Sequence, residues 1–209
     1  MSPRSLVVVT AGLSVPSSTR LLADQLSAAA VTAAAARGVP LDVRVIELRD
    51  LAHDVTNHLL TGFAPGALRE ALDAVAAADG LIAVTPVFNA SFSGLFKSFL
   101  DVLDRDALVD KPVLAAATGG TGRHSLVLEH ALRPLFAYLR AATVPTAVFA
   151  ASADWGGEAD GGSDGPEGQL RARITRAGGE LAREIERRDP VRVSDPFALT
   201  MSLQDMLDG

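Results

Sequence analysis

The fold is decided by the stretch LVVVTAGLSVPSSTRLL, residues 6–22. Its first part, Leu6–Thr10, is a short apolar run typical of a buried strand. A loop rich in hydroxyl side chains follows. From Leu21 to Ala29, apolar residues then recur at three- and four-residue spacing, as on one face of a helix. The stretch therefore predicts a buried strand, a loop and a helix in that order.

The same alternation recurs along most of the chain. Further apolar runs lie at Leu41–Ile46, Gly80–Thr85, Pro112–Thr118 and Thr143–Phe149. Further helical patterns lie at Leu68–Val75, Leu95–Leu103, Leu128–Leu139 and Leu170–Ile185. Continuous apolar strands that alternate with helices indicate a parallel sheet covered on both faces. We predict an α/β fold, a flavodoxin-like three-layer sandwich whose five-stranded parallel sheet has the order 2-1-3-4-5.

Two segments stand apart from this alternation. Trp155–Gly168 contains six glycines, and we expect a mobile excursion there before the last helix. Residues 190–209 form a tail rich in large apolar side chains, which we expect to pack on the domain or on a partner subunit. The 209 residues therefore predict one flavodoxin-like domain at 1–189 and a C-terminal tail at 190–209.

Composition excludes several classes of function. The net charge of −6 argues against nucleic-acid binding, and the absence of cysteine excludes disulfides, thiolate catalysis and cysteine-ligated metals. No apolar segment approaches the roughly 20 residues that cross a bilayer. Arg4 and Leu6–Val9 resemble the start of a signal peptide, but the apolar run ends after four residues, so we interpret it as a strand and expect a cytoplasmic protein.

The histidines do not predict a metal site. His53 and His58 are five residues apart, and His124 and His130 are six apart. Neither spacing puts both imidazoles on one face of a helix, and no carboxylate cluster accompanies them. We therefore expect no bound metal.

The loop after the first predicted strand has the residues of an anion site. It carries Ser14, Ser17, Ser18 and Thr19, followed by Arg20, just where a helix begins. A helix N-terminus offers unpaired amides and a partial positive charge, and hydroxyls donate to phosphate oxygens. Ordinary helix capping by serine is the alternative interpretation, but it needs only one of these hydroxyls. We favour a phosphate site.

The loops after the third and fourth predicted strands suit a flat ligand. Pro86–Asn89 present apolar and amide groups at the carboxyl edge of the sheet, although Ser91 or Ser93 could also simply cap the next helix. In Thr118-Gly119-Gly120, the glycines let the backbone approach a ligand closely. A dinucleotide fingerprint is a weaker interpretation of this last loop, because the third glycine and the following acidic residue are missing.

Together these loops resemble one known family. The similar segments are PVFNASFSGLFK (86–97), ATGGT (117–121), HALRP (130–134) and PSST (16–19). The combination resembles the NADPH-dependent FMN reductase family of flavodoxin-like fold, and most closely the reductase components of two-component flavin monooxygenases.

The resemblance implies a set of ligand contacts. The FMN phosphate would lie at Ser14, Ser17, Ser18, Thr19 and Arg20; the isoalloxazine would lie between Pro86, Val87, Phe88 and Asn89 on one side and Thr118, Gly119 and Gly120 on the other. It also implies a homodimer or homotetramer. At the position of Ser14, several members of the family have a basic residue. At the position of His130, some relatives have a tyrosine that is associated with a helix bulge.

The resemblance implies hydride transfer from NADPH or NADH to FMN, with reduced flavin supplied to a monooxygenase. The cofactor performs this chemistry, so we assign no catalytic side chain. Two alternatives stay open: an FMN-containing NAD(P)H:quinone, azo-dye or chromate reductase, and a non-enzymatic electron carrier. Electron carriers usually enclose the flavin between aromatics, whereas Trp155 and Tyr138, each the only residue of its type, lie outside the three loops. An open ring face favours a reductase.

Overall fold

The computed structural model of the chain describes residues 3–155 and 165–191. Its strands are β1 (Arg4–Thr10), β2 (Leu41–Glu47), β3 (Gly80–Phe88), β4 (Ser91–Phe92), β5 (Pro112–Gly119), β6 (Ala142–Thr143) and β7 (Val148–Ala151). They form one sheet in the order β2-β1-β3-β5-β6, with β7 also paired to β5. All pairs are parallel except the hairpin of β3 with β4. The predicted flavodoxin-like order is confirmed, and β5 is the predicted fourth strand.

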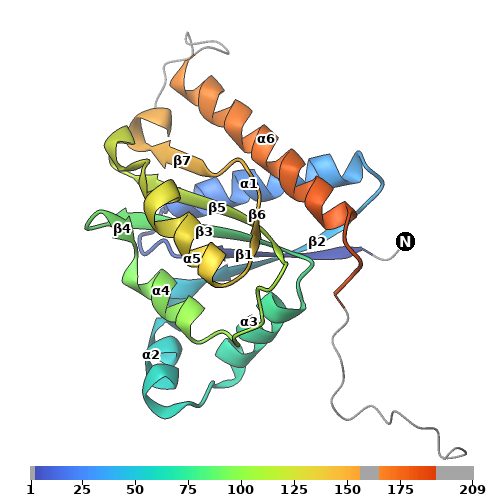
Figure 1. Cartoon of the computed structure of the whole chain (residues 1–209). Helices are drawn as coiled ribbons and strands as arrows, with labels where there is room; N and C mark the ends of the chain where they lie inside the picture. Colours follow the sequence, from blue (N-terminus) through green and yellow to red (C-terminus); the bar gives the residue numbers. More distant parts are fainter. Residues whose placement is uncertain (1–2, 156–164, 192–209) are drawn as a thin grey trace, which may run out of the picture.

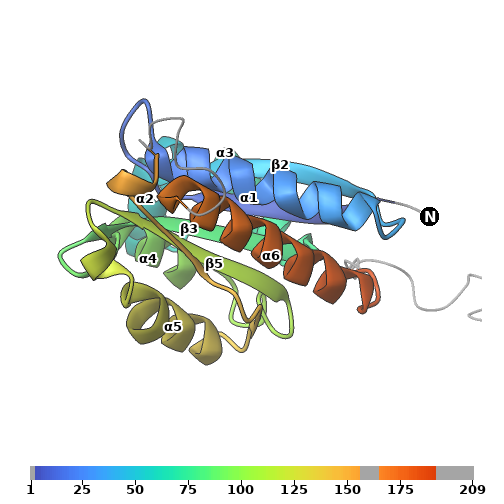
Figure 2. The same cartoon turned by 90° about the horizontal axis from the view of Figure 1, so that it is seen from above.

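Helices cover both faces of this sheet. They are α1 (Ser18–Ala35), α2 (Ala52–Thr61), α3 (Gly66–Ala77), α4 (Gly94–Asp101), α5 (Arg133–Tyr138) and α6 (Pro166–Glu186). Short 3-10 turns are η1 (Leu48–Leu51), η2 (Gly122–His124) and η4 (Ser152–Trp155), and η3 (Leu128–Leu132) is a π-helix. In Figure 1, α6 lies above the strands while α3 and α4 lie below them; Figure 2 shows α1 and α6 side by side. Within the described residues, no helix is long and apolar enough to span a membrane.

The two layers of the core follow from the alternation of side chains along β1. Leu6 and Val8 point to the cluster formed with α1 and α6, whereas Val7 and Val9 point to the cluster formed with α2, α3, α4 and α5. All four side chains are at most 1% exposed. The first apolar run is therefore a central strand buried on both faces, as parallel sheets require.

The last predicted strand, Thr143–Phe149, is interrupted. Pro145 has no amide hydrogen to donate to β5, so the chain pairs as β6, leaves the sheet and returns as β7. The amide and the hydroxyl of Thr146 donate instead to the Glu180 carboxylate of α6, at 2.7 and 2.8 Å. The prediction of one continuous strand was wrong because it ignored the missing donor.

One helix and the segment before α6 also differ from what the sequence predicts. Helix α2 was not predicted. The expected excursion at Trp155–Gly168 is shorter than predicted, because Trp155 belongs to η4 and Pro166 already begins α6. Its centre, residues 156–164, lies outside the described residues, as does nearly all of the tail at 190–209, so the packing of that tail stays a prediction.

Candidate functional site

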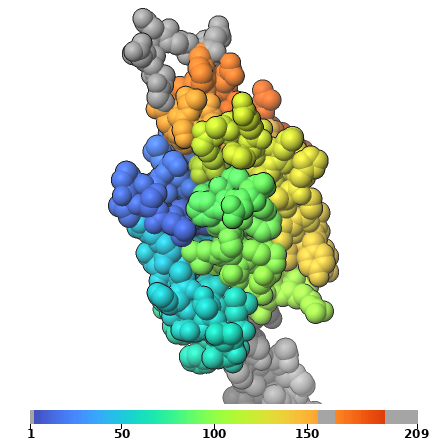
Figure 3. All heavy atoms as spheres, turned by 90° about the vertical axis from the view of Figure 1, so that its left-hand side faces the viewer, coloured from blue at the N-terminus to red at the C-terminus, as the bar shows by residue number. Residues whose placement is uncertain are grey.

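A pocket of about 350 Å³ opens at the carboxyl edge of the sheet, where the loops after β1, β3 and β5 meet. Its lining comprises Gly12, Leu13, Ser14, Ser18, Thr19, Pro86, Val87, Phe88, Thr118, Gly119, Gly120 and Ser152. Nine of the twelve residues predicted from the sequence are in this lining. Figure 3 views this edge, with the loop after β1 in blue beside the β3–β4 hairpin in green.

The first turn of α1 presents free backbone donors to the pocket. Ser17 is the N-cap, and its Oγ accepts a hydrogen bond of 3.2 Å from the amide of Arg20. The amides of Ser18 and Thr19 donate to no acceptor among residues 3–155 and 165–191. Such unpaired donors, with the partial positive charge of the helix end, favour an anion.

Gly12 makes room for this arrangement. A Cβ atom there would lie 2.1 Å from Ser17 Oγ and 3.1 Å from Thr19 Cβ, so only glycine lets the loop fold back onto the start of α1. Ser17 itself is absent from the pocket lining because its hydroxyl caps the helix. The loop thus forms a cradle with the chemistry that a phosphate group requires.

Thr19 and Thr118 join two of the three loops. Their hydroxyls are 2.8 Å apart and hydrogen-bonded, and the two residues are 3% and 4% exposed. This bond fixes the start of α1 against the end of β5. The sequence predicted both residues in the site, but it did not predict that they contact each other.

Arg20 does not line the pocket. Its guanidinium donates to Asp24 at 2.8 Å and to Glu47 at 2.5 Å, and these carboxylates, Asp24 foremost, raise the pKa of Arg20. Glu47 also pairs with Arg49 at 3.3 Å, and Arg49 donates to the carbonyl of Ser14 at 3.5 Å. The cations beside the cradle are therefore paired with carboxylates, and the cradle itself is built from amides and hydroxyls.

The β3–β4 hairpin forms the second wall. Val87 pairs with Phe92 and Phe88 with Ser91, and the turn residues Asn89 and Ala90 have φ values of 47° and 67°. Asn89 is therefore at the tip of the turn and outside the pocket lining; asparagine suits the left-handed conformation found there. Phe88 is 46% exposed at the mouth of the pocket.

Ser93, rather than Ser91, caps the helix that follows this hairpin. Its Oγ accepts from the amide of Phe96 at 3.2 Å, and its own amide donates to Thr85 Oγ1 at 3.0 Å. The capping interpretation and the ligand interpretation of this loop are thus compatible, because they concern different residues.

Gly119 and Gly120, at the end of β5, differ in the space that a side chain would have. A Cβ at Gly119 would lie 2.9 Å from Phe149 Cζ and 3.6 Å from His124 Cβ, whereas one at Gly120 would meet nothing within 4 Å. Gly119 is therefore needed for packing, and Gly120 leaves open space beside the pocket.

The sequence did not predict three of the lining residues, Gly12, Leu13 and Ser152. Ser152 follows the last strand, and its position after a strand of the same sheet was the available signal.

The fold and this pocket define a flavodoxin-like nucleotide-binding protein, with an anion cradle at the first helix and a slot between two loops. The model of the NADPH-dependent FMN reductase family matches residues 5–156. The chain belongs to this family, and it is an NAD(P)H-dependent oxidoreductase that uses FMN.

Similar proteins agree with this assignment. The chain is 44% identical to "FMN reductase (NADPH)" of Pseudomonas aeruginosa, over 74% of this chain and 80% of that protein. It is 42% identical to "NADH-dependent FMN reductase SfnE" of Pseudomonas putida, over 73% and 80%. A solved oxidoreductase structure from Corynebacterium diphtheriae is 49% identical, with a TM-score of 0.84 over 90% of this chain and all of that one.

Proposed function

We propose that the pocket binds FMN with its phosphate at the first turn of α1 and its ring between the hairpin and the Thr118–Gly120 segment. The observation that carries this proposal is that the amides of Ser18 and Thr19 have no acceptor among the described residues and lie beside the hydroxyl of Ser14 in one pocket. Bound FMN would supply the group that accepts a hydride from the nicotinamide. The side chains of this site bind and orient the ligands, and none is required to carry a proton.

Isothermal titration calorimetry with FMN and with riboflavin tests the phosphate assignment. Riboflavin has the same ring without the phosphate, so we expect it to bind more weakly. Replacing Ser18 by Ala should weaken FMN binding by about ten- to a hundredfold, because a hydrogen bond to a charged group contributes roughly 1.5–3 kcal/mol. Riboflavin binding should stay unchanged. Ser27→Ala is the matched control, since Ser27 is on the same helix but does not line the pocket.

Equal affinities for FMN and riboflavin in the wild type would refute the phosphate site. They would leave Ser17–Thr19 as an ordinary helix cap. A loss of both ligands in Ser18→Ala would instead indicate a general disturbance of the loop, which thermal unfolding of the variant detects.

We further propose that the enzyme releases reduced flavin to a monooxygenase. Among the described residues, Phe88 is the one aromatic side chain in the lining, and it is half exposed, which supports an open ring face that a nicotinamide can reach. Leu13 and Val15, beside the cradle, are 53% and 79% exposed. The test is oxidation of NAD(P)H: a rate that rises with added free FMN supports a dissociable flavin, and a protein that purifies with one tightly held FMN contradicts it.

We also propose a homodimer or homotetramer that acts in the cytoplasm. Exposed apolar side chains on and beside α2 support the oligomer: Leu59, Leu60 and Phe63 are 50%, 81% and 70% exposed. Leu6–Val9 belongs to a buried strand of the core, which supports its interpretation as a strand rather than as part of a secretory signal. Light scattering after size-exclusion chromatography measures the oligomeric state, and a monomer at micromolar concentration would contradict it.

A further inference from the structure

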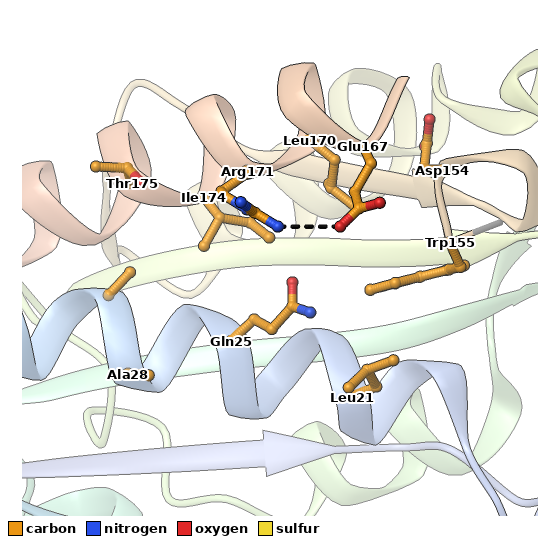
Figure 4. A pocket seen from close by; sticks show the side chains of 11 residues that line it. Leu21, Gln25, Ala28, Asp154, Trp155, Glu167, Leu170, Arg171, Ile174 and Thr175 are labelled. Atoms are coloured by element: carbon orange, nitrogen blue, oxygen red, sulfur yellow. Dashed lines mark hydrogen bonds and ion pairs between the residues drawn. The ribbon is translucent and has the colours of Figure 1, made fainter. Parts of the chain in front are cut away.

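A second cavity, of about 520 Å³, lies between α1 and α6 and is distinct from the flavin pocket. This volume is within the roughly 300–1,000 Å³ of small-molecule sites. Its walls come from the two helices, and η4 closes one end. Figure 4 shows that Trp155 from η4 and Gln25 from α1 extend into the space between the helices.

The cavity adjoins the flavin pocket on both walls. On α1, Ser18 lines the flavin pocket and Leu21 lines the second cavity; residues three apart are neighbours on one helix face. On the opposite wall, Ser152 lines the flavin pocket while Asp154 and Trp155, in the same 3-10 turn, line the cavity. The border between the two spaces is therefore about one helical turn wide, and it lies at the start of α1.

This border is where our proposed function places the phosphate of the flavin. A group attached beyond that phosphate would continue past Ser18 toward Leu21 and into the cavity. FMN has no such group, whereas FAD carries a second phosphate and an adenosine at this point.

The lining suits an adenine base. The Trp155 indole offers a flat apolar surface, and Leu170 and Ile174 of α6 add apolar walls. Stacking of a base on an aromatic side chain contributes about 1–3 kcal/mol. The Gln25 amide has both a donor and an acceptor, and such amides pair with the N6 and N7 edge of adenine.

The charges distinguish between kinds of adenosine. Three charged side chains line the cavity: Asp154, Glu167 and Arg171. Arg171 pairs with Glu167 at 3.0 Å, and Asp154 lies 4.0 Å from the guanidinium of Arg173, so each charged side chain described in the lining has a partner of opposite charge. Carboxylates accept hydrogen bonds from ribose hydroxyls, whereas no unpaired cation among the described lining residues is available to bind the 2′-phosphate of NADPH.

We propose that the cavity between α1 and α6 is an adenosine subsite, through which the enzyme binds FAD as well as FMN. The proposal rests on the proposed function, because it needs the flavin phosphate at the first turn of α1.

Calorimetric titration of the full chain with FMN and with FAD tests the subsite. The first variant is Trp155→Ala, which removes the stacking surface. We expect it to raise the Kd for FAD about tenfold and to change the Kd for FMN less than about twofold. The second variant, Ala28→Phe, fills the cavity from an exposed position on α1 and should have the same selective effect. Tyr138→Ala, which removes an aromatic ring 84% exposed on α5, is the control and should change neither constant.

The outcomes separate this inference from the proposed function. If neither flavin binds the wild type, the proposed function fails. If FMN binds and FAD does not, or if both variants weaken the two flavins equally, the subsite is refuted while the flavin site stands. If FAD binding is unchanged but the KM for NADH or NADPH rises, the cavity takes the adenosine of the nicotinamide nucleotide, and our assignment to FAD is wrong.

Discussion

The crossing of α1 and α6 depends on Gly178, and its replacement by Ala gives a sharp test of the packing. A Cβ atom there would lie 2.8 Å from both Ala29 C and Ala30 N of α1. These are backbone atoms, so no rotation of a side chain relieves the contact, and the two helices must move apart. Gly179, the next residue of α6, would place its Cβ within 4 Å of nothing. The two glycines therefore form a matched pair in one helix.

The expected effects have opposite signs. Ala in place of Gly inside a helix is favourable by up to about 1 kcal/mol, so Gly179→Ala should raise the free energy of unfolding by roughly that amount. Gly178→Ala gains the same preference but overpacks the helix crossing, which costs typically about 1–3 kcal/mol and more against backbone. We expect a net loss of about 1–2 kcal/mol, measured by urea denaturation of the flavin-free protein with a common m value. Equal stabilisation by both substitutions would refute the close contact between the helices.

Three further predictions concern single polar groups. Burial lowers the pKa of Lys111 to about 8, and its Nζ donates to three carbonyls at the end of α3. Between about pH 8 and 10.5 the unfolded chain holds a proton that the folded chain lacks, so the free energy of unfolding should rise with pH. Denaturation curves of the wild type and of Lys111→Met measure this rise, and we expect the difference between them to grow by up to about 3 kcal/mol over that range. The hydroxyl of Thr10 is buried with no partner among the described residues, so Thr10→Val should stabilise the protein by about 1 kcal/mol in urea; a loss would show that the hydroxyl is satisfied. Glu47→Gln should release Arg20 from one carboxylate and lower the Kd for FMN up to about fivefold in calorimetry. Riboflavin binding should stay unchanged. A weaker FMN complex would mean that Glu47 positions the loop.

The core of the fold was predictable because it depends on patterns that local sequence carries. Continuous apolar runs such as Leu6–Val9 predicted buried parallel strands, and helical spacing predicted five of the six α-helices. The misses have local causes as well. Helix α2 is only ten residues long and has four apolar residues, of which Val55 alone is fully buried, so its helical spacing rests on too few positions to be recognised. The break at Pro145 was visible in the sequence as a residue without a backbone donor.

The site was predictable in position but less so in its contacts. Parallel strands end at one edge, so residues after β1, β3 and β5 had to converge there. The sequence does not say which neighbour a side chain chooses, however. Arg20 pairs with Glu47, which is 27 residues away in the chain, and the Thr19–Thr118 bond spans 99 residues. Contacts of this kind depend on the register of the finished sheet, which no local pattern encodes.

The distribution of charge around the cradle bears on whether the flavin can leave. Arg20 and Arg49 share Glu47, and Arg20 also binds Asp24, so the two guanidiniums nearest the loop have carboxylate partners. A phosphate at this place would be held by amides, hydroxyls and the end of a helix, each of which contributes modestly, rather than by an unpaired guanidinium in a two-pronged contact. In our proposal, such a cradle would recognise a phosphate through several separate donors and without a fixed cation. The half-exposed Phe88 at the pocket mouth and the lack of an unpaired guanidinium support our proposal that the flavin enters, is reduced and dissociates.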